Sequence, residues 1–126
     1  MTTEEVANQL VQLCREGKFD QVYQELFSPD IVSVEPEGNP TGTVRGMEAL
    51  KIKGEKWNEM VEEMMASEIS DPIVAADHFS CAWKSKVKFK GMEEIVDVDE
   101  ISVYKVEGGK IVLEQFFYTP LPELAI

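Results

Sequence analysis

The chain has few positive charges, one histidine, two cysteines and no long hydrophobic run. Its 12 Lys plus Arg face 24 Asp plus Glu, giving a formal net charge of −12. No basic patch could therefore neutralise a nucleic-acid backbone or hold the chain to an anionic membrane. No apolar stretch approaches the roughly 20 residues that cross a bilayer. We expect binding to neither nucleic acid nor membrane.

The scarcity of cysteine and histidine excludes further classes. Cys14 and Cys81 have no motif spacing, so they predict neither a disulfide framework nor, with a single histidine, a zinc site. A reduced, cytoplasmic setting is the default for such a chain. The first ten residues, MTTEEVANQL, are acidic and polar, unlike a secretory signal or transit peptide.

The 126 residues, 44% of them hydrophobic, predict one domain over residues 1–126 with a core of its own. Hydrophobic spacing predicts three helices followed by strands. The helices are expected at 3–16, 19–27 and 47–63. Strands are expected at 31–35, 66–70, 72–75, 78–90, 95–106 and 111–118, with a loop over 35–46.

Charge pairing and a two-glycine turn predict the register of the last three strands. Lys88 is placed opposite Asp97, and the Gly108-Gly109 turn pairs Glu107 with Lys110. One face of the sheet is then mostly apolar and includes Phe79, Trp83, Val87, Phe89, Glu100, Ser102, Tyr104, Gln115 and Phe117. The other face has lysines at one end and, at the other, apolar residues that a second copy of the chain would cover. A bulge would exchange the faces locally.

Two stretches carry a family resemblance. "LFSPDIVSVEP" followed by "GTVRGMEALKIKGEKW", and the closing "DEISVYKVEGGKIVLEQFFY", resemble SnoaL-like proteins of the nuclear transport factor two-like superfamily. The resemblance implies an α+β fold with three N-terminal helices. A cone-shaped, curved antiparallel sheet is expected to wrap around a long helix. Members include polyketide cyclases, ketosteroid isomerases, epoxide hydrolases, dehydratases and non-catalytic binding or dimerisation modules, so the fold does not select an activity.

The resemblance also suggests one catalytic position. In ketosteroid isomerases, a carboxylate beside the proline that ends the first strand is the proton-transfer base, and Glu35, before Pro36, matches it. The tyrosine and aspartic acid that complete that site fall on Leu10 and near Ser102 here. The steroid reaction is therefore not matched, which leaves another proton transfer or ring closure on an apolar molecule.

Each candidate residue has a structural alternative. Glu35 is either a general base or a loop carboxylate paired with Arg45 or capping a turn. Glu100, on the apolar face, is either a buried acid or a structural carboxylate bonded to Ser85, Ser102 or Gln115. The aromatic residues Trp57, Trp83, Tyr104 and Phe117 either line a ligand cavity or form core. His78 is either a catalytic group paired with Asp77 or Glu107 or, as its position favours, a surface residue. Glu114 and Tyr118 are also expected to face outward, unless a bulge turns any of the three inward.

We therefore predict a SnoaL-like homodimer that binds a small apolar or amphipathic molecule. If it is an enzyme, its chemistry is cofactor-free and metal-free, with Glu35 as base and Glu100 as acid or orienting group. Tyr104 and Gln115 would supply hydrogen bonds, and the pocket walls would be Trp57, Trp83 and Phe117. The alternative is a non-catalytic ligand-binding or dimerisation module.

Overall fold

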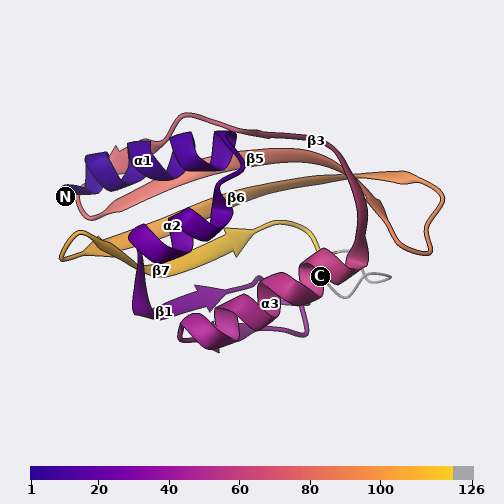
Figure 1. The fold of residues 1–126 in the computed structure, drawn as a ribbon, viewed down its shortest axis with the longest axis horizontal. Coiled ribbons are helices and arrows are strands. Elements are labelled where there is room, and N and C mark those ends of the chain that lie inside the picture. The colour runs from indigo at the N-terminus through magenta and orange to yellow at the C-terminus, as the bar shows by residue number, and fades with distance from the viewer. Residues whose placement is uncertain (121–126) are drawn as a thin grey trace.

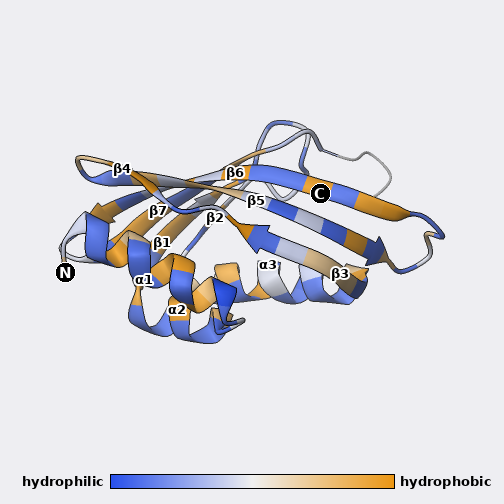
Figure 2. Ribbon diagram, turned by 90° about the horizontal axis from the view of Figure 1, so that it is seen from above, coloured by the Kyte–Doolittle hydropathy of each residue, from blue (hydrophilic) through white to orange (hydrophobic). Residues whose placement is uncertain are grey.

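Three helices cover one face of a curved seven-stranded sheet (Figures 1 and 2). The computed structural model describes residues 1–120. Its elements are α1 (Thr3–Arg15), α2 (Phe19–Glu25), β1 (Phe27–Val34), β2 (Thr43–Arg45), α3 (Met47–Met60), β3 (Val61–Ile69), β4 (Ile73–Ala75), β5 (His78–Phe89), β6 (Ile95–Glu107) and β7 (Lys110–Phe117). Within the described part of the chain, no helix is long and apolar enough to cross a membrane.

The sheet is mixed, which corrects the prediction of a purely antiparallel sheet. Its order is β2-β1-β7-β6-β5-β3, with β4 paired to β5. The pairs β1–β2, β3–β5, β5–β6 and β6–β7 are antiparallel, but β1 and β7 are parallel. The sequence pattern finds strands and hairpins, but it does not show that the last strand returns beside the first in the same direction.

Most elements lie where the periodicity predicts, with shifts at their ends. The predicted third helix ends at Met60, three residues early, and the chain continues directly into β3. The first strand starts at Phe27 rather than 31, and β2 lies in the stretch expected to be a loop. Gly46, with a φ of 89°, precedes α3 in a conformation that glycine adopts without strain.

The observed β5–β6 register is shifted by two residues from the predicted one. Asp97 lies opposite Lys86, with Nζ and Oδ1 2.7 Å apart, and Glu100 lies opposite Trp83. Because side chains alternate with a period of two, this shift leaves each residue on its predicted face.

A bulge between β6 and β7 corrects the predicted faces of β7. Val106 pairs with Ile111 but Lys105 pairs with Leu113, so one extra residue lies in β7. After the bulge, Tyr104 lies opposite Glu114. The bulge therefore turns Glu114 and Phe116 toward the helices, and it places the predicted pocket residues Gln115 and Phe117 on the opposite face.

The core lies between α1, α2 and one end of the sheet, and leaves the rest of the helix-covered face open. Val6, Leu10 and Val11 on α1 are at most 3% exposed. A capping box formed by Thr2 and Glu5 fixes the start of this helix. On the other side of the cluster lie Ile31, Phe79, Tyr104 and Ile111. The third helix packs instead against β1, β2 and β3.

Candidate active site

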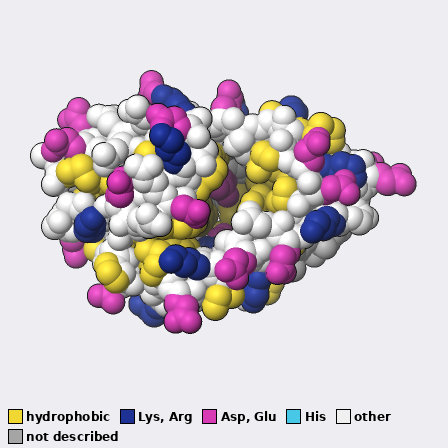
Figure 3. All heavy atoms as spheres, in the orientation of Figure 1, with side chains coloured by type: hydrophobic (Ala, Val, Ile, Leu, Met, Phe, Trp, Pro, Cys, Tyr) yellow, Lys and Arg dark blue, Asp and Glu magenta, His cyan; other side chains and the backbone are white. Residues whose placement is uncertain are grey.

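A cavity of about 1510 Å³ lies between the helices and the sheet and opens to the surface. Figure 3 shows the hollow, with acidic side chains inside and hydrophobic ones around it. Eight aromatic residues are part of its wall: Phe19, Tyr23, Phe27, Trp57, Trp83, Tyr104, Phe116 and Tyr118. The space between the helices and the curved sheet is therefore not filled by side chains of the described residues.

Glu35 follows β1 directly, and both of its carboxylate oxygens have partners. Lys53 Nζ on α3 lies 2.5 Å from Oε1, and the Tyr118 hydroxyl donates to Oε2 at 2.7 Å. The side chains of Glu35 and Lys53 are only 9% and 17% exposed. The cationic partner of Glu35 is thus Lys53 and not Arg45, which is exposed in β2.

Lys53 also connects Glu35 to a second carboxyl group. Its ammonium donates to the Ser33 hydroxyl at 2.8 Å, and that hydroxyl donates to Glu114 Oε1 at 2.7 Å. Ser33 and Glu114 are 0% and 5% exposed. The same ammonium lies 5.1 Å from the centre of the Phe116 ring, a cation–π contact. One lysine therefore holds together α3, the end of β1 and the inward face of β7.

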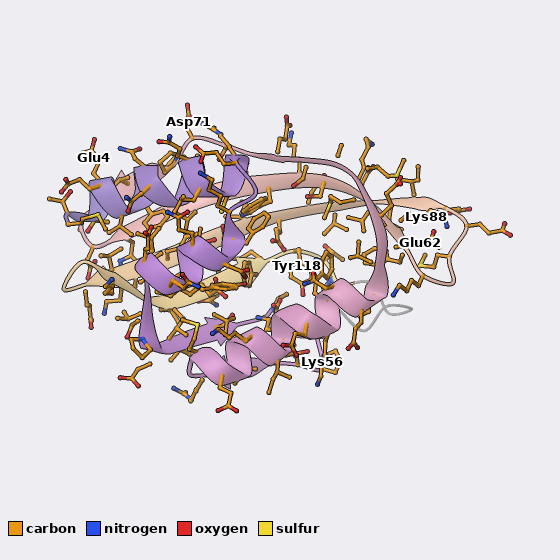
Figure 4. All side chains as sticks on the ribbon, viewed as in Figure 1. Glu4, Lys56, Glu62, Asp71, Lys88 and Tyr118 are labelled. Atoms are coloured by element: carbon orange, nitrogen blue, oxygen red, sulfur yellow. The ribbon has the colours of Figure 1, made fainter. Side chains whose placement is uncertain are left out.

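Tyr118 ties the loop after β1 to this network. Asn39 Nδ2 donates to the Tyr118 oxygen at 2.6 Å while the hydroxyl donates to Glu35. In Figure 4, Tyr118 lies in the space between β7 and α3. Burial, followed by the bond to Glu35, raises the Tyr118 pKa strongly, so its hydroxyl keeps its proton and acts as a donor.

Glu100 and Glu114 are the two carboxyl groups whose pKa is displaced toward neutrality. Burial raises the pKa of each to about 7. For Glu100, the negative charges of Glu35 and Glu114 add to the increase while Lys53 opposes it. For Glu114, the Ser33 hydrogen bond and Lys53 oppose the increase. Groups with such values can take up and release protons near pH 7.

Five of the seven residues predicted for the site lie on the cavity wall. These are Glu35, Trp57, Trp83, Glu100 and Tyr104. Gln115 and Phe117 do not line it, because the bulge turns them to the outer face. None of the predicted structural bonds of Glu100 to Ser85, Ser102 or Gln115 forms within residues 1–120. His78 is 46% exposed and lies outside the cavity wall, and its Nδ1 is 2.8 Å from Asp77 Oδ1.

Lys53, Ser33 and Asn39 were not predicted as site residues. Glu114 and Tyr118 were expected to face outward unless a bulge intervened, but both line the cavity. A signal existed for Lys53, which lies three residues after Leu50 and four before Trp57, on the edge of the apolar stripe of α3. Ser33 alternates with Val32 and Val34, so its inward position could be found only with the register of β1. The described residues contain no cluster of three or more side chains suited to a metal.

Comparison with known proteins defines the class. The model of the SnoaL-like domain matches residues 1–118. A candidate SnoaL-like polyketide cyclase from Mesorhizobium loti is 32% identical, with a TM-score of 0.87 over 94% of this chain and 100% of that one. The chain therefore belongs to the SnoaL-like family, and its neighbours share the nuclear transport factor two-like and cystatin-like fold.

More distant structures share the fold. TerC, co-crystallised with polyporic acid, is 16% identical with a TM-score of 0.74, covering 93% of this chain and 91% of its own. A protein with a ketosteroid isomerase-like fold from Catenulispora acidiphila, in complex with trimethylamine, is 20% identical with a TM-score of 0.71, covering 91% and 85%. No protein of curated function matches the sequence.

Replacing the Glu100 carboxyl should stabilise the fold at alkaline pH. Because its folded pKa of about 7 lies above its ordinary value of 4.5, folding favours the protonated form, and stability falls as pH rises through this range. Glu100→Gln should remove that loss. We expect its advantage over the parent in free energy of unfolding, from urea titrations, to grow by about 1–3 kcal/mol between pH 5 and pH 8.

The exposed Glu94→Gln serves as the control, since it removes the same charge far from the cavity. Its stability relative to the parent should change little over this range. An advantage of Glu100→Gln that stays constant with pH would contradict the proposed burial of an ionisable Glu100.

Proposed function

We propose that the chain binds a small, largely apolar molecule in this cavity and exchanges a proton with it, without a cofactor. One observation supports this most directly. Glu35 and Glu100, both chosen from the sequence, reach one aromatic-walled cavity together with Glu114. A filled cone would have favoured a dimerisation module instead.

In this proposal, Glu100 is the group that transfers the proton. It receives no hydrogen bond within the described residues and has a pKa of about 7, so it can act as base or acid at neutral pH. Glu35 is less suited to the role of base predicted from the sequence, because Lys53 and Tyr118 occupy both of its oxygens. Glu35 would instead position Lys53.

Lys53 would stabilise negative charge that develops on the ligand. Two of its three N–H donors point to Glu35 and Ser33, which leaves one for a ligand oxygen. A carbonyl compound fits this arrangement. Glu100 would remove a proton from the carbon beside the carbonyl, and the electron pair of the broken C–H bond would move to the oxygen near Lys53. The proton would then return to the same or another atom of the ligand.

The second candidate function is a carrier that binds without catalysis. The large open cavity favours it, and structures of this fold have been solved with polyporic acid and with trimethylamine. The two functions share the cavity and differ only in whether Glu100 exchanges protons with the ligand. The cytoplasmic location expected from the sequence stays a prediction.

Exchange of carbon-bound hydrogen in a neutral ketone separates the two functions. We expect the protein to speed the exchange of the α-hydrogens of 2-indanone for deuterium, measured by proton NMR in deuterium oxide. The rate should rise with pH through a midpoint near 7, because Glu100 must be ionised to remove the proton. Glu100→Gln should lose the acceleration, whereas Glu94→Gln should keep it. Binding of the ketone with no exchange above the buffer rate would instead identify a carrier.

We also propose that the outer sheet face joins two copies of the chain. Ile101 and Phe117 lie opposite each other on this face and are 51% and 50% exposed. Val103 follows Ile101 on the same face, and Val32 and Leu113 form a further apolar pair beyond Val103 and Gln115. Apolar residues grouped in this way are typical of an interface rather than of a surface in water.

Light scattering after size-exclusion chromatography tests the dimer. We expect a particle of twice the 14.2 kDa chain mass, and Ile101→Lys should convert it to a monomer because a buried, unpaired charge is costly at an interface. Ile95→Lys is a matched control, since Ile95 is 52% exposed but lies at the far end of β6. A parent protein that runs as a monomer, or equal effects of the two variants, would refute this interface.

A further inference from the structure

We propose that the ligand of this cavity carries a positively charged group, such as an ammonium, on an apolar body. This inference rests on the proposed binding function and names the ligand class. It follows from the balance of charge in the cavity, the free carboxyl oxygens that face it and the aromatic rings beside them.

Charge is balanced at the rim of the cavity but not in its interior. The exposed charged residues of the wall cancel, with three cations and three anions: Arg15, Lys51, Lys56, Asp20, Glu55 and Glu68. The charged residues that are not exposed are one cation and three acids: Lys53, Glu35, Glu100 and Glu114. When all three acids are ionised, the interior carries a charge of −2. A ligand that brings positive charge would restore neutrality there.

The acids left without a cation present free oxygens to the cavity. Within residues 1–120, every fully buried side-chain nitrogen or oxygen has a hydrogen-bond partner. Glu114 has one bond, from Ser33 to Oε1, although its residue is only 5% exposed. Its Oε2 must therefore reach open space, and both oxygens of Glu100 must do the same. Since both residues line the cavity, that space is the cavity itself.

The same wall holds aromatic rings beside the two acids. Trp83 lies directly opposite Glu100 in the sheet, and Tyr104 lies opposite Glu114. An organic cation is attracted to such rings as well as to carboxylates, and its alkyl groups lose little on leaving water. An inorganic cation would need several oxygen ligands at short distance, and no such cluster exists among the described residues.

The groups that face these two acids predict how binding depends on pH. The pKa of Glu100 is affected by the charges of Glu35, Glu114 and Lys53. The pKa of Glu114 is affected by the Ser33 hydrogen bond and by the charges of Lys53 and Glu35. The neighbouring Cys14, Tyr23 and Tyr104 keep their protons, because each has a raised pKa. Of these wall residues, Glu100 and Glu114 are therefore the ones that ionise between pH 6 and pH 8. A bound cation would favour their ionised forms.

The test compares two probes of the same shape, phenyltrimethylammonium and the neutral tert-butylbenzene. Binding is followed by fluorescence, because both tryptophans of the chain, Trp57 and Trp83, line the cavity. The quaternary probe does not titrate, so any pH effect belongs to the protein. We expect it to bind roughly tenfold tighter than the neutral probe at pH 8. Its affinity should fall about tenfold at pH 6 for each carboxyl that must ionise.

Two variants distinguish binding in the cavity from attraction of the probe to the overall negative charge of the chain. Glu100→Gln should lower the affinity for the ammonium probe and leave the affinity for the neutral probe unchanged. Glu94→Gln should change neither affinity. Equal losses from both variants would attribute binding to the overall charge of −12 and refute the proposal. Tight binding of the neutral probe alone would overturn the cationic ligand but leave the apolar-ligand function standing. If neither probe bound, both the cationic ligand and the apolar-ligand function would be refuted.

Discussion

The arrangement of the site depends on a single ammonium group shared between two carboxyl groups. Lys53 pairs with Glu35 and, through the Ser33 hydroxyl, reaches Glu114. These contacts join α3 to β1 and β7, which are far apart in the sequence but adjacent in space (Figure 1). A buried pair of this kind adds little net stability, but removing one partner leaves an uncompensated charge. The ion pair is thus best understood as fixing geometry.

The surplus of acid around that lysine is the basis of the proposed proton exchange in the cavity. With one cation for three carboxyl groups, Glu100 and Glu114 are left in surroundings that penalise their charged forms. We therefore expect the fold to lose stability as the pH rises through the range in which these two groups ionise. The rest of the acidity contributes differently. Exposed carboxylates such as Glu62 and Asp97 form surface pairs with Lys88 and Lys86, and such pairs add little stability.

Much of the fold could be predicted from the sequence because it follows from local patterns. Helical spacing located α1 and α3, and the Gly108-Gly109 turn fixed the pairing of Glu107 with Lys110. The bulge between Ile111 and Leu113 could not be predicted, because its extra residue leaves the sequence pattern of "KIVLEQFF" unchanged and alters only which side chains face inward. Because of this one extra residue, Glu114 lines the cavity and Gln115 does not. Lys53 could not be predicted for a related reason. Its partner Glu35 is 18 positions away in the sequence, and the two meet only because α3 packs on β1.

We infer that burial, reinforced by the repulsion among three carboxyl groups that share one lysine, raises the pKa of Glu100 and of Glu114 into the neutral range. Carbon-13 NMR of the glutamate side-chain carboxyls, followed from pH 4 to pH 9, tests it directly. We expect two signals, assigned to Glu100 and Glu114 by their Gln variants, that titrate near pH 7, and a further upward shift of both midpoints in Lys53→Met. Titration of both residues near the ordinary value of 4.5, or midpoints unmoved by the loss of Lys53, would contradict it.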